Sequence, residues 1–218
     1  MDTSHVALVS LNLSQDGFEF FHADTSMVLG VNISNLAKVM KLADNNDSIS
    51  LSASQDGSHL KIVFENPKTE RRTEFNLNLI TIDSEHLAIP ETEYASVISM
   101  GSGEFSRICK ELYSISETVS VTTNREFVQF SVDGDVGSGS VKLGPNEGAG
   151  KGDQTVLEIN DSVEQQFALR YLNLFNKAAT LTSFTRLCLH QEQPLVIEYN
   201  IENLGALKYF LAPKISDE

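Results

Sequence analysis

The chain has 218 residues and a formal net charge of −14, because 30 acidic side chains outnumber 16 basic ones. Hydrophobic residues make up 41% of the chain, a share that is typical of a globular protein and excludes a disordered acidic tail. Such an acidic surface repels nucleic acid on average, so that any DNA binding requires basic residues gathered in one place.

Most of the chain alternates apolar and polar residues, which is the pattern of half-buried β-strands. Turn signals such as Gln15-Asp16-Gly17 and Gln55-Asp56-Gly57 separate the alternating segments and favour antiparallel hairpins. In chain order, the predicted strands span residues 5–14, 48–54, 59–65, 73–82, 94–100, 119–124, 127–134, 139–144, 155–159, 185–191, 194–201 and 206–213.

Three segments switch to helical spacing. The first, residues 32–45, has Ser34 as its predicted N-cap, and the second, residues 102–115, begins at Ser102. The third, residues 167–177, is the stretch FALRYLNLFNK, which contains two cations and no acid. The predicted apolar stripes are Leu36, Val39, Met40 and Leu42 on the first helix, Phe105, Ile108, Cys109 and Leu112 on the second, and Phe167, Leu169, Leu172, Leu174 and Phe175 on the third.

Each predicted helix carries a pair of basic residues, spaced so that both lie roughly on one side. The pairs are Lys38 and Lys41, Arg107 and Lys110, and Arg170 and Lys177. One such pair is what the solvated face of any amphipathic helix shows. Three pairs in an acidic chain instead indicate a shared electropositive surface, which would hold DNA phosphates without reading the base sequence. A helix followed by about four strands also recurs, which indicates an internal structural repeat.

At these residues the chain resembles the eukaryotic sliding-clamp family, that of proliferating cell nuclear antigen (PCNA). The resemblance covers essentially the whole length and rests on MDTSHVALV, GVNISNLAKVMKLA, LAIPETEY, SGEFSRICKEL, FALRYLNLFNKA, PLVIEYNI and LKYFLAPKI. It implies an α+β DNA-clamp (processivity) fold with two similar domains per subunit, helices that line a ring and antiparallel sheets outside. The expected domains are residues 1–78 and 96–218, joined by a linker at residues 79–95.

The function that the resemblance implies is that of a nuclear sliding clamp without enzymatic activity. Such a clamp is the processivity factor for a replicative DNA polymerase and a docking platform for the clamp loader and for replication and repair proteins with PCNA-interacting motifs. It would surround double-stranded DNA as a homotrimer, without sequence specificity, cofactor or metal. Numerous weak phosphate contacts suit this role because they hold DNA without arresting sliding. The positions that match DNA-facing residues of the family are Lys38, Lys41, Arg71, Arg107, Lys110, Arg170 and Lys177.

Two further surfaces follow from the resemblance. A hydrophobic pocket for partner peptides is expected at His5, Val6, Leu8, Leu87, Ala88, Ile89, Pro194, Phe210, Ala212, Pro213 and Ile215. The alternative for Leu87 and Ile89 is that the linker packs on its own domain. Subunits are expected to join by sheet edges, residues 70–78 of one pairing with residues 136–144 of the next, with Phe75, Gly139 and Val141 at the interface.

The chain departs from the family at two places. Arg125 stands where the family usually carries the lysine that receives ubiquitin, and a guanidinium has no amine to conjugate. The family also has a strand–helix–strand unit before the segment that matches Met1. Without that unit, we expect a native-like second domain, a loosened first domain, weak trimers and weak loading on DNA. The edge at residues 136–144 would still let the chain cap a complete clamp as an inhibitor.

The sequence also bears on other classes of function. The loop GPNEGAGKGDQ has Pro145 and Gly152 where a phosphate-binding loop needs glycine and Ser or Thr, so that a surface loop is favoured. The 5 histidines lack metal-ligand spacing, and the only cysteines, Cys109 and Cys188, lie in apolar stretches typical of buried thiols. No apolar run approaches a membrane span, which predicts a soluble protein. The open alternatives are an enzyme with its own active site, a checkpoint-type clamp subunit and a truncated clamp paralogue.

Overall fold

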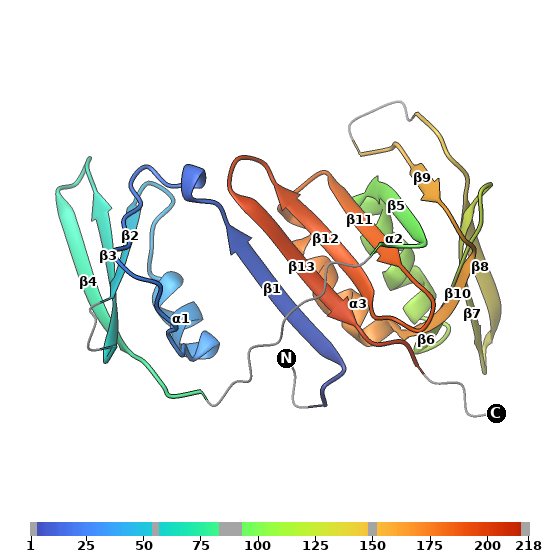
Figure 1. The fold of residues 1–218 in the computed structure, drawn as a ribbon, viewed down its shortest axis with the longest axis horizontal. Helices are drawn as coiled ribbons and strands as arrows, with labels where there is room; N and C mark the ends of the chain where they lie inside the picture. The colour runs from blue at the N-terminus through green and yellow to red at the C-terminus, as the bar shows by residue number, and fades with distance from the viewer. Residues whose placement is uncertain (1–3, 54–56, 83–92, 148–151, 215–218) are drawn as a thin grey trace. The chain divides into compact units, whose positions relative to one another are not determined.

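The computed structural model describes residues 4–53, 57–82, 93–147 and 152–214 (Figure 1). The chain packs as two units: a large unit, comprising residues 1–21 and 91–218, and a small unit, comprising residues 22–90. The predicted division into domains at residues 78 and 96 follows the family pattern and stays a prediction. The packing units place the first 21 residues with the C-terminal part of the chain.

The large unit contains two antiparallel sheets. The six-stranded sheet has the order β1-β13-β12-β11-β5-β9, and the four-stranded sheet has the order β10-β6-β7-β8. The strands of the first are β1 (Ala7–Leu13), β5 (Ser96–Gly101), β9 (Val156–Ile159), β11 (Phe184–Leu189), β12 (Leu195–Ile201) and β13 (Gly205–Leu211). Those of the second are β6 (Thr118–Thr123), β7 (Val128–Gly134), β8 (Gly137–Leu143) and β10 (Val163–Ala168).

Helices and both sheets of the large unit share one hydrophobic core. Helix α2 (Ser102–Tyr113) ends in a turn, and helix α3 (Leu169–Phe175) continues directly into the 3-10 helix η2 (Asn176–Thr180). The amide of Asn173 in α3 donates a hydrogen bond to the carbonyl of Cys109 in α2 at 3.4 Å, which joins the two helices. The fully buried core side chains include Phe105, Ile108, Phe130, Phe167, Leu169, Leu172, Leu187, Leu189 and Tyr199.

Strand β1 completes the six-stranded sheet from the beginning of the chain. It pairs with β13 along its whole length, from Ala7 opposite Leu211 to Leu13 opposite Gly205. Gly205 has φ of 146°, and a Cβ there would lie 1.9 Å from the carbonyl oxygen of Asn12, so that only glycine permits this close approach. A short 3-10 helix, η1 (Gln15–Gly17), follows β1 at the predicted Gln15-Asp16-Gly17 turn.

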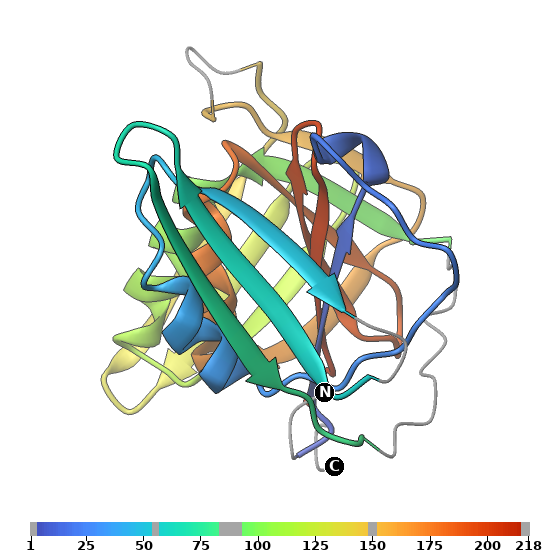
Figure 2. The same cartoon turned by 90° about the vertical axis from the view of Figure 1, so that its left-hand side faces the viewer.

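The small unit is a three-stranded antiparallel sheet with one helix on one of its faces (Figure 2). The strands are β2 (Ser48–Ala53), β3 (His59–Asn66) and β4 (Arg71–Asn78), and the helix is α1 (Ile33–Met40). Its core consists of Ile62, Phe64 and Leu77, against which Leu36, Val39 and Met40 of α1 pack. No residue of α1 is fully buried, whereas α2 buries Ser102, Phe105, Ser106, Ile108, Cys109 and Leu112.

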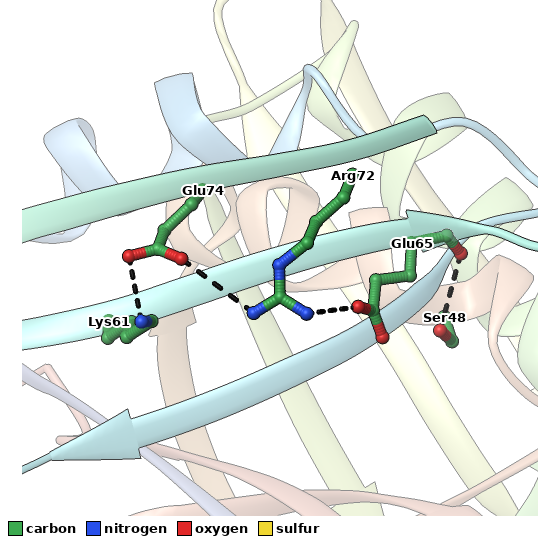
Figure 3. A network of polar contacts seen from close by, with 5 residues as sticks. All are labelled: Ser48, Lys61, Glu65, Arg72 and Glu74. Atoms are coloured by element: carbon green, nitrogen blue, oxygen red, sulfur yellow. Dashed lines mark hydrogen bonds and ion pairs between the residues drawn. The ribbon is translucent and has the colours of Figure 1, made fainter. Parts of the chain in front are cut away.

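Charged side chains cover the other face of the small unit's sheet (Figure 3). Lys61 Nζ lies 2.7 Å from Glu74 Oε1, and the guanidinium of Arg72 lies 3.8 Å from the same carboxylate. Arg72 also forms an ion pair with Glu65 of β3. These pairs follow the register, in which Val63 lies opposite Glu74 and Glu65 opposite Arg72, so that the network lies on the face on which Val63 is buried.

Three predicted features of the helices need correction. Asn32, not Ser34, caps α1, because its side-chain oxygen accepts a hydrogen bond from Asn35 N at 3.0 Å. Phe167 belongs to β10, where alternate residues Val163, Gln165 and Phe167 are buried, and α3 begins only at Leu169. The predicted stripe residues Leu42 and Leu174 are 57% and 53% exposed. Helix α2 begins at Ser102 as predicted.

Candidate functional site

Helix α2 presents two of the predicted cations on its solvent face. Arg107 and Lys110 are exposed, and they alternate with the side chains that α2 buries in the core, Ile108 and Cys109. Burial raises the pKa of the Cys109 thiol to about 12. Because one face of the helix is fixed by this burial, the two cations are held on the opposite face, toward solvent.

The two cations of α2 differ in their surroundings. Arg107 forms an ion pair with Glu104, three residues earlier in the helix. Arg107 Nη2 lies 2.7 Å from Glu104 Oε2 and 2.8 Å from Oε1, and Arg107 Nε lies 3.1 Å from Oε2. Hydrogen bonding to Glu104 raises the pKa of Arg107, which keeps the guanidinium charged. Lys110, by contrast, forms no ion pair with any residue that the structure describes.

The second pair of cations lies on α3 and η2. The guanidinium of Arg170 lies over the ring of its neighbour Tyr171, 4.8 Å from the centroid, and Lys177 is exposed in η2. The segment from Leu169 to Thr180 contains no acidic residue. The exposed faces of α3 and η2 are therefore positive, and the exposed face of α2 carries two cations with Glu104 and Glu111.

The remaining predicted DNA-facing residues lie on the small unit. Lys38 is in the last turn of α1 and Lys41 is its C-cap, where positive charge is favoured by the helix dipole. Arg71 begins β4, and its Nε donates a hydrogen bond to Thr73 Oγ1 at 3.3 Å. All three side chains are exposed. A single surface formed by the cations of all three helices stays a prediction.

A row of apolar side chains crosses the six-stranded sheet on the face opposite the main core. In register, Leu8 of β1 lies opposite Phe210, Phe210 opposite Val196, Val196 opposite Cys188, and Cys188 opposite Val97. Val97, Cys188 and Val196 are buried, and Phe210 and Tyr94 pack against them. Burial also raises the pKa of the Cys188 thiol to about 11. This apolar row is a suitable floor for a peptide pocket.

The structure places several other predicted pocket residues beside this row, just beyond the paired ends of β1, β12 and β13. Ala212 N donates a hydrogen bond to the carbonyl of Val6 at 2.9 Å, which joins the segment after β13 to the segment before β1. His5 and Pro194 are exposed, and Ala212 and Pro213 are half-buried. His5 has φ of 58°, in the left-handed region. The predicted pocket residues Leu87, Ala88, Ile89 and Ile215 lie outside the described residues.

Sequence reasoning missed four contributors to the apolar row: Tyr94, Val97, Cys188 and Val196. Tyr94 precedes β5, and the strands that carry the other three are apolar at consecutive positions, as in Leu187, Cys188 and Leu189. Such a run indicates burial on both faces of a sheet, which was the available signal. The run alone does not tell which residues face the main core.

The two strands predicted to join subunits are both end strands of their sheets. Strand β4 ends the three-stranded sheet and β8 ends the four-stranded one. Phe75 of β4 packs into the small unit's core, with its ring centroid 5.8 Å from that of Phe64, and Val141 of β8 packs against the main core. Gly139, also on β8, is half-buried. What these edges leave open is their backbone, and their role between subunits stays a prediction.

Among the described residues, no group of three His, Cys, Asp or Glu side chains is arranged to hold a metal ion. None of the helices in the described ranges is long and apolar enough to cross a membrane. Arg125, the position predicted to differ from the family, is exposed in the turn between β6 and β7.

Comparison with known protein families gives two matches in chain order. Residues 1–86 match the family described as proliferating cell nuclear antigen, N-terminal domain. Residues 88–214 match proliferating cell nuclear antigen, C-terminal domain. The predicted α+β fold with antiparallel sheets is confirmed. The chain belongs to the PCNA family of DNA sliding clamps.

Proposed function

We propose that the chain works as a sliding clamp in the nucleus, closing around double-stranded DNA as a homotrimer. In this role it is a processivity factor for a replicative DNA polymerase and a docking platform for the clamp loader and for replication and repair proteins. The family is that of non-enzymatic clamps, and we expect no turnover by this chain. The proposal combines three features of the chain: helix cations, an apolar row on a sheet, and two open sheet edges.

The observation that carries the proposal is the charge on the helix faces. Arg107, Lys110, Arg170 and Lys177 are all exposed on helices whose other faces are packed in the core. The chain as a whole has a net charge of −14, so that a cluster of cations on these faces differs from the acidic character of the rest of the chain. Exposed Lys and Arg on rigid helices suit contacts with phosphates, which carry no base-sequence information.

The apolar row from Leu8 to Val97 supports a second activity, the binding of partner peptides. A motif with aliphatic and aromatic anchors would bury its side chains against the half-buried residues of the row, Leu8 and Phe210, of which Phe210 packs on the buried Val196 and Cys188. A few such anchors in an apolar cup are a common source of most of the binding energy. The DNA-facing and peptide-binding roles then use different residues, which lets a clamp hold both at once.

Assembly into a ring would use the edges of β4 and β8. An antiparallel or parallel pairing of these strands between subunits satisfies the backbone groups that both edges leave open. Because the two edges differ, the contact is head to tail, and such contacts close into a ring when the rotation per subunit allows it.

A subunit of a mixed ring, as in checkpoint-type clamps, is the second candidate. It is favoured by large apolar side chains that are exposed near the sheet edges: Val9 at 51% and Leu11 at 55% on β1, and Ile49 at 44% and Leu51 at 54% on β2. Surfaces of this kind usually meet another protein.

Light scattering coupled to gel filtration separates these candidates. The homotrimer predicts a mass three times that of the 24.0 kDa chain at micromolar concentration, and loss of the trimer when an added proline interrupts β8. A chain that stays monomeric alone but joins a different clamp protein on mixing would support the second candidate. A monomer that joins none would exclude both forms of ring.

A further inference from the structure

The arginines and lysines on the helices of the large unit are not equivalent. Arg107 is held in a two-pronged contact by Glu104, and Arg170 lies over the ring of Tyr171. Lys110 makes no ion pair within the described ranges. Arg107 is therefore already paired with Glu104 before any DNA arrives.

Glu104 is the fixed partner of this pair. It is in the first turn of α2, where a carboxylate is stabilised by the helix dipole, and its side chain is only 32% exposed. It also lines an open cavity of about 1000 Å³, together with Gly103, Asp153, Thr182 and Glu198. Arg107 is 64% exposed and can leave the pair by rotating its side chain. The difference in exposure favours movement of the guanidinium over movement of the carboxylate.

We propose that Glu104 is a positioning residue that competes with DNA phosphate for Arg107. This inference rests on the proposed DNA-binding function. A phosphate that takes Arg107 must break a bidentate contact, in which Nη2 donates to Oε1 at 2.8 Å and Nε donates to Oε2 at 3.1 Å, so that Arg107 adds less to the hold on DNA than Lys110 does. Such an exchange between two anions returns Arg107 to Glu104 when a phosphate leaves, which suits a surface that must slide.

The competition has a distinct signature in the dependence on salt. Each cation that neutralises a phosphate releases counterions and adds about 0.9 to the slope of log affinity against log salt. When Arg107 leaves Glu104, however, the freed carboxylate takes up a cation, which offsets part of that release. Removing the charge of Glu104 should therefore tighten binding at low salt and also steepen the slope, by up to about 0.9.

The experiment compares Glu104→Gln with Glu111→Gln in the 218-residue chain. Both changes remove one negative charge from α2, but Glu111 acts on Arg107 only through space. Binding of a fluorescent DNA duplex is measured by anisotropy over a series of salt concentrations, for each variant with Arg107 intact and with Arg107→Ala. Lys110→Ala serves as the check that this helix face binds DNA, and thermal unfolding checks that α2 stays folded.

We expect Glu104→Gln to strengthen duplex binding by about two- to fivefold at low salt, a range that corresponds to the measured strength of exposed ion pairs. This gain in affinity should exceed that of Glu111→Gln, and Glu104→Gln should also steepen the salt slope. In the Arg107→Ala background, the gain from Glu104→Gln should shrink to that of Glu111→Gln. Equal gains for both variants with Arg107 present, or an unchanged slope, would overturn the role of Glu104.

The failure of the proposed function gives a different result. Wild-type chain without duplex binding, or with binding that Lys110→Ala leaves unchanged, would exclude the DNA-facing role of α2 and the competition with it. The contact between Glu104 and Arg107 can be measured without DNA, from the nuclear magnetic resonance signal of the Arg107 side-chain Nε–H. That signal should shift and exchange faster with water in Glu104→Gln but not in Glu111→Gln. Unchanged signals would show that the pair does not hold Arg107 in solution.

Discussion

Leu8 of β1 lies directly opposite Phe210 of β13, although the two residues come from opposite ends of the chain. This pairing makes the start of the chain an edge of the large unit's sheet. It also continues the apolar row of Phe210, Val196 and Cys188 by one more strand. A peptide pocket built on this row therefore depends on both ends of the sequence being folded together.

The first prediction concerns that row. Replacing Phe210 by Ala should weaken the binding of a peptide with a PCNA-interacting motif by about 2 kcal/mol or more, because an aromatic anchor in a buried row is a typical hot spot. Calorimetry with the peptide measures the loss. Phe20→Ala is the matched control, since Phe20 is 83% exposed and lies outside the row. Equal peptide affinity in both variants would rule the row out as the binding floor.

The linker gives a companion test. Ile89 lies outside the described residues, and its place in the pocket rests on the resemblance to the family. Changing Ile89 to Ser should remove a second anchor contact, also about 2 kcal/mol, while duplex binding stays the same. If peptide affinity survives this change but not Phe210→Ala, the linker packs on its own domain instead.

The helix cations should act additively. Replacing Lys110 or Lys177 by Ala should weaken duplex binding modestly, lower the salt slope by up to about one unit each, and give the sum of both effects in the double variant. Lys68→Ala, in the exposed turn between β3 and β4, is the control for the loss of a surface charge. A single replacement that abolished binding without unfolding the chain would instead indicate one specific site.

The two units should differ in local stability. Helix α1 has no fully buried residue, and its sheet exposes Ile49 and Leu51, whereas α2 is anchored by six buried residues. We therefore expect amide hydrogens of α1 and β2 to exchange with solvent much faster than those of α2 and β12. Mass spectrometry of the exchanging chain measures this. Uniform protection of both units would contradict this difference in local stability.

The two buried thiols predict how the stability of the folded chain depends on pH. Burial raises the pKa values of Cys109 and Cys188 from 9.0 to about 12 and about 11. The folded state therefore keeps thiol protons that the unfolded state loses, so that stability is fully present below pH 9 and falls as the pH rises from 9 toward 11. Urea unfolding at pH 8 and pH 10 should show this loss, and it should shrink in the Cys109→Ser, Cys188→Ser variant. Rapid labelling of either thiol in the folded chain at pH 8 would contradict their burial.

Local features of the fold were predictable from sequence, and long-range ones were not. Ser102 was correctly predicted as the start of α2, because the alternation of β5 ends there and helical spacing follows. Ser34 was wrongly chosen over Asn32 because both residue types cap helices and only the backbone geometry decides between them. Phe167 fits both the strand and the helix pattern at the junction of β10 and α3.

The candidate sites show the same limit. The helix cations were found because exposed charges follow from helical spacing, and all of them are exposed. The contact between Glu104 and Arg107 was visible as a spacing of three residues, but its geometry depends on how Glu104 is held at the start of α2. Cys188 was missed as part of the apolar row because β11 is apolar on both faces, and the partner strands decide which face is which.

The central claim is that the chain closes a ring around DNA, and retention on circular DNA tests it most directly. The chain is loaded by a clamp loader onto a nicked DNA circle, separated from free protein by gel filtration, and followed after one cut linearises the circle. The account predicts that the chain stays on the intact circle. Once the cut has made the DNA linear, the chain slides off its ends. Equal loss from circle and linear DNA, or equal retention on both, would contradict it.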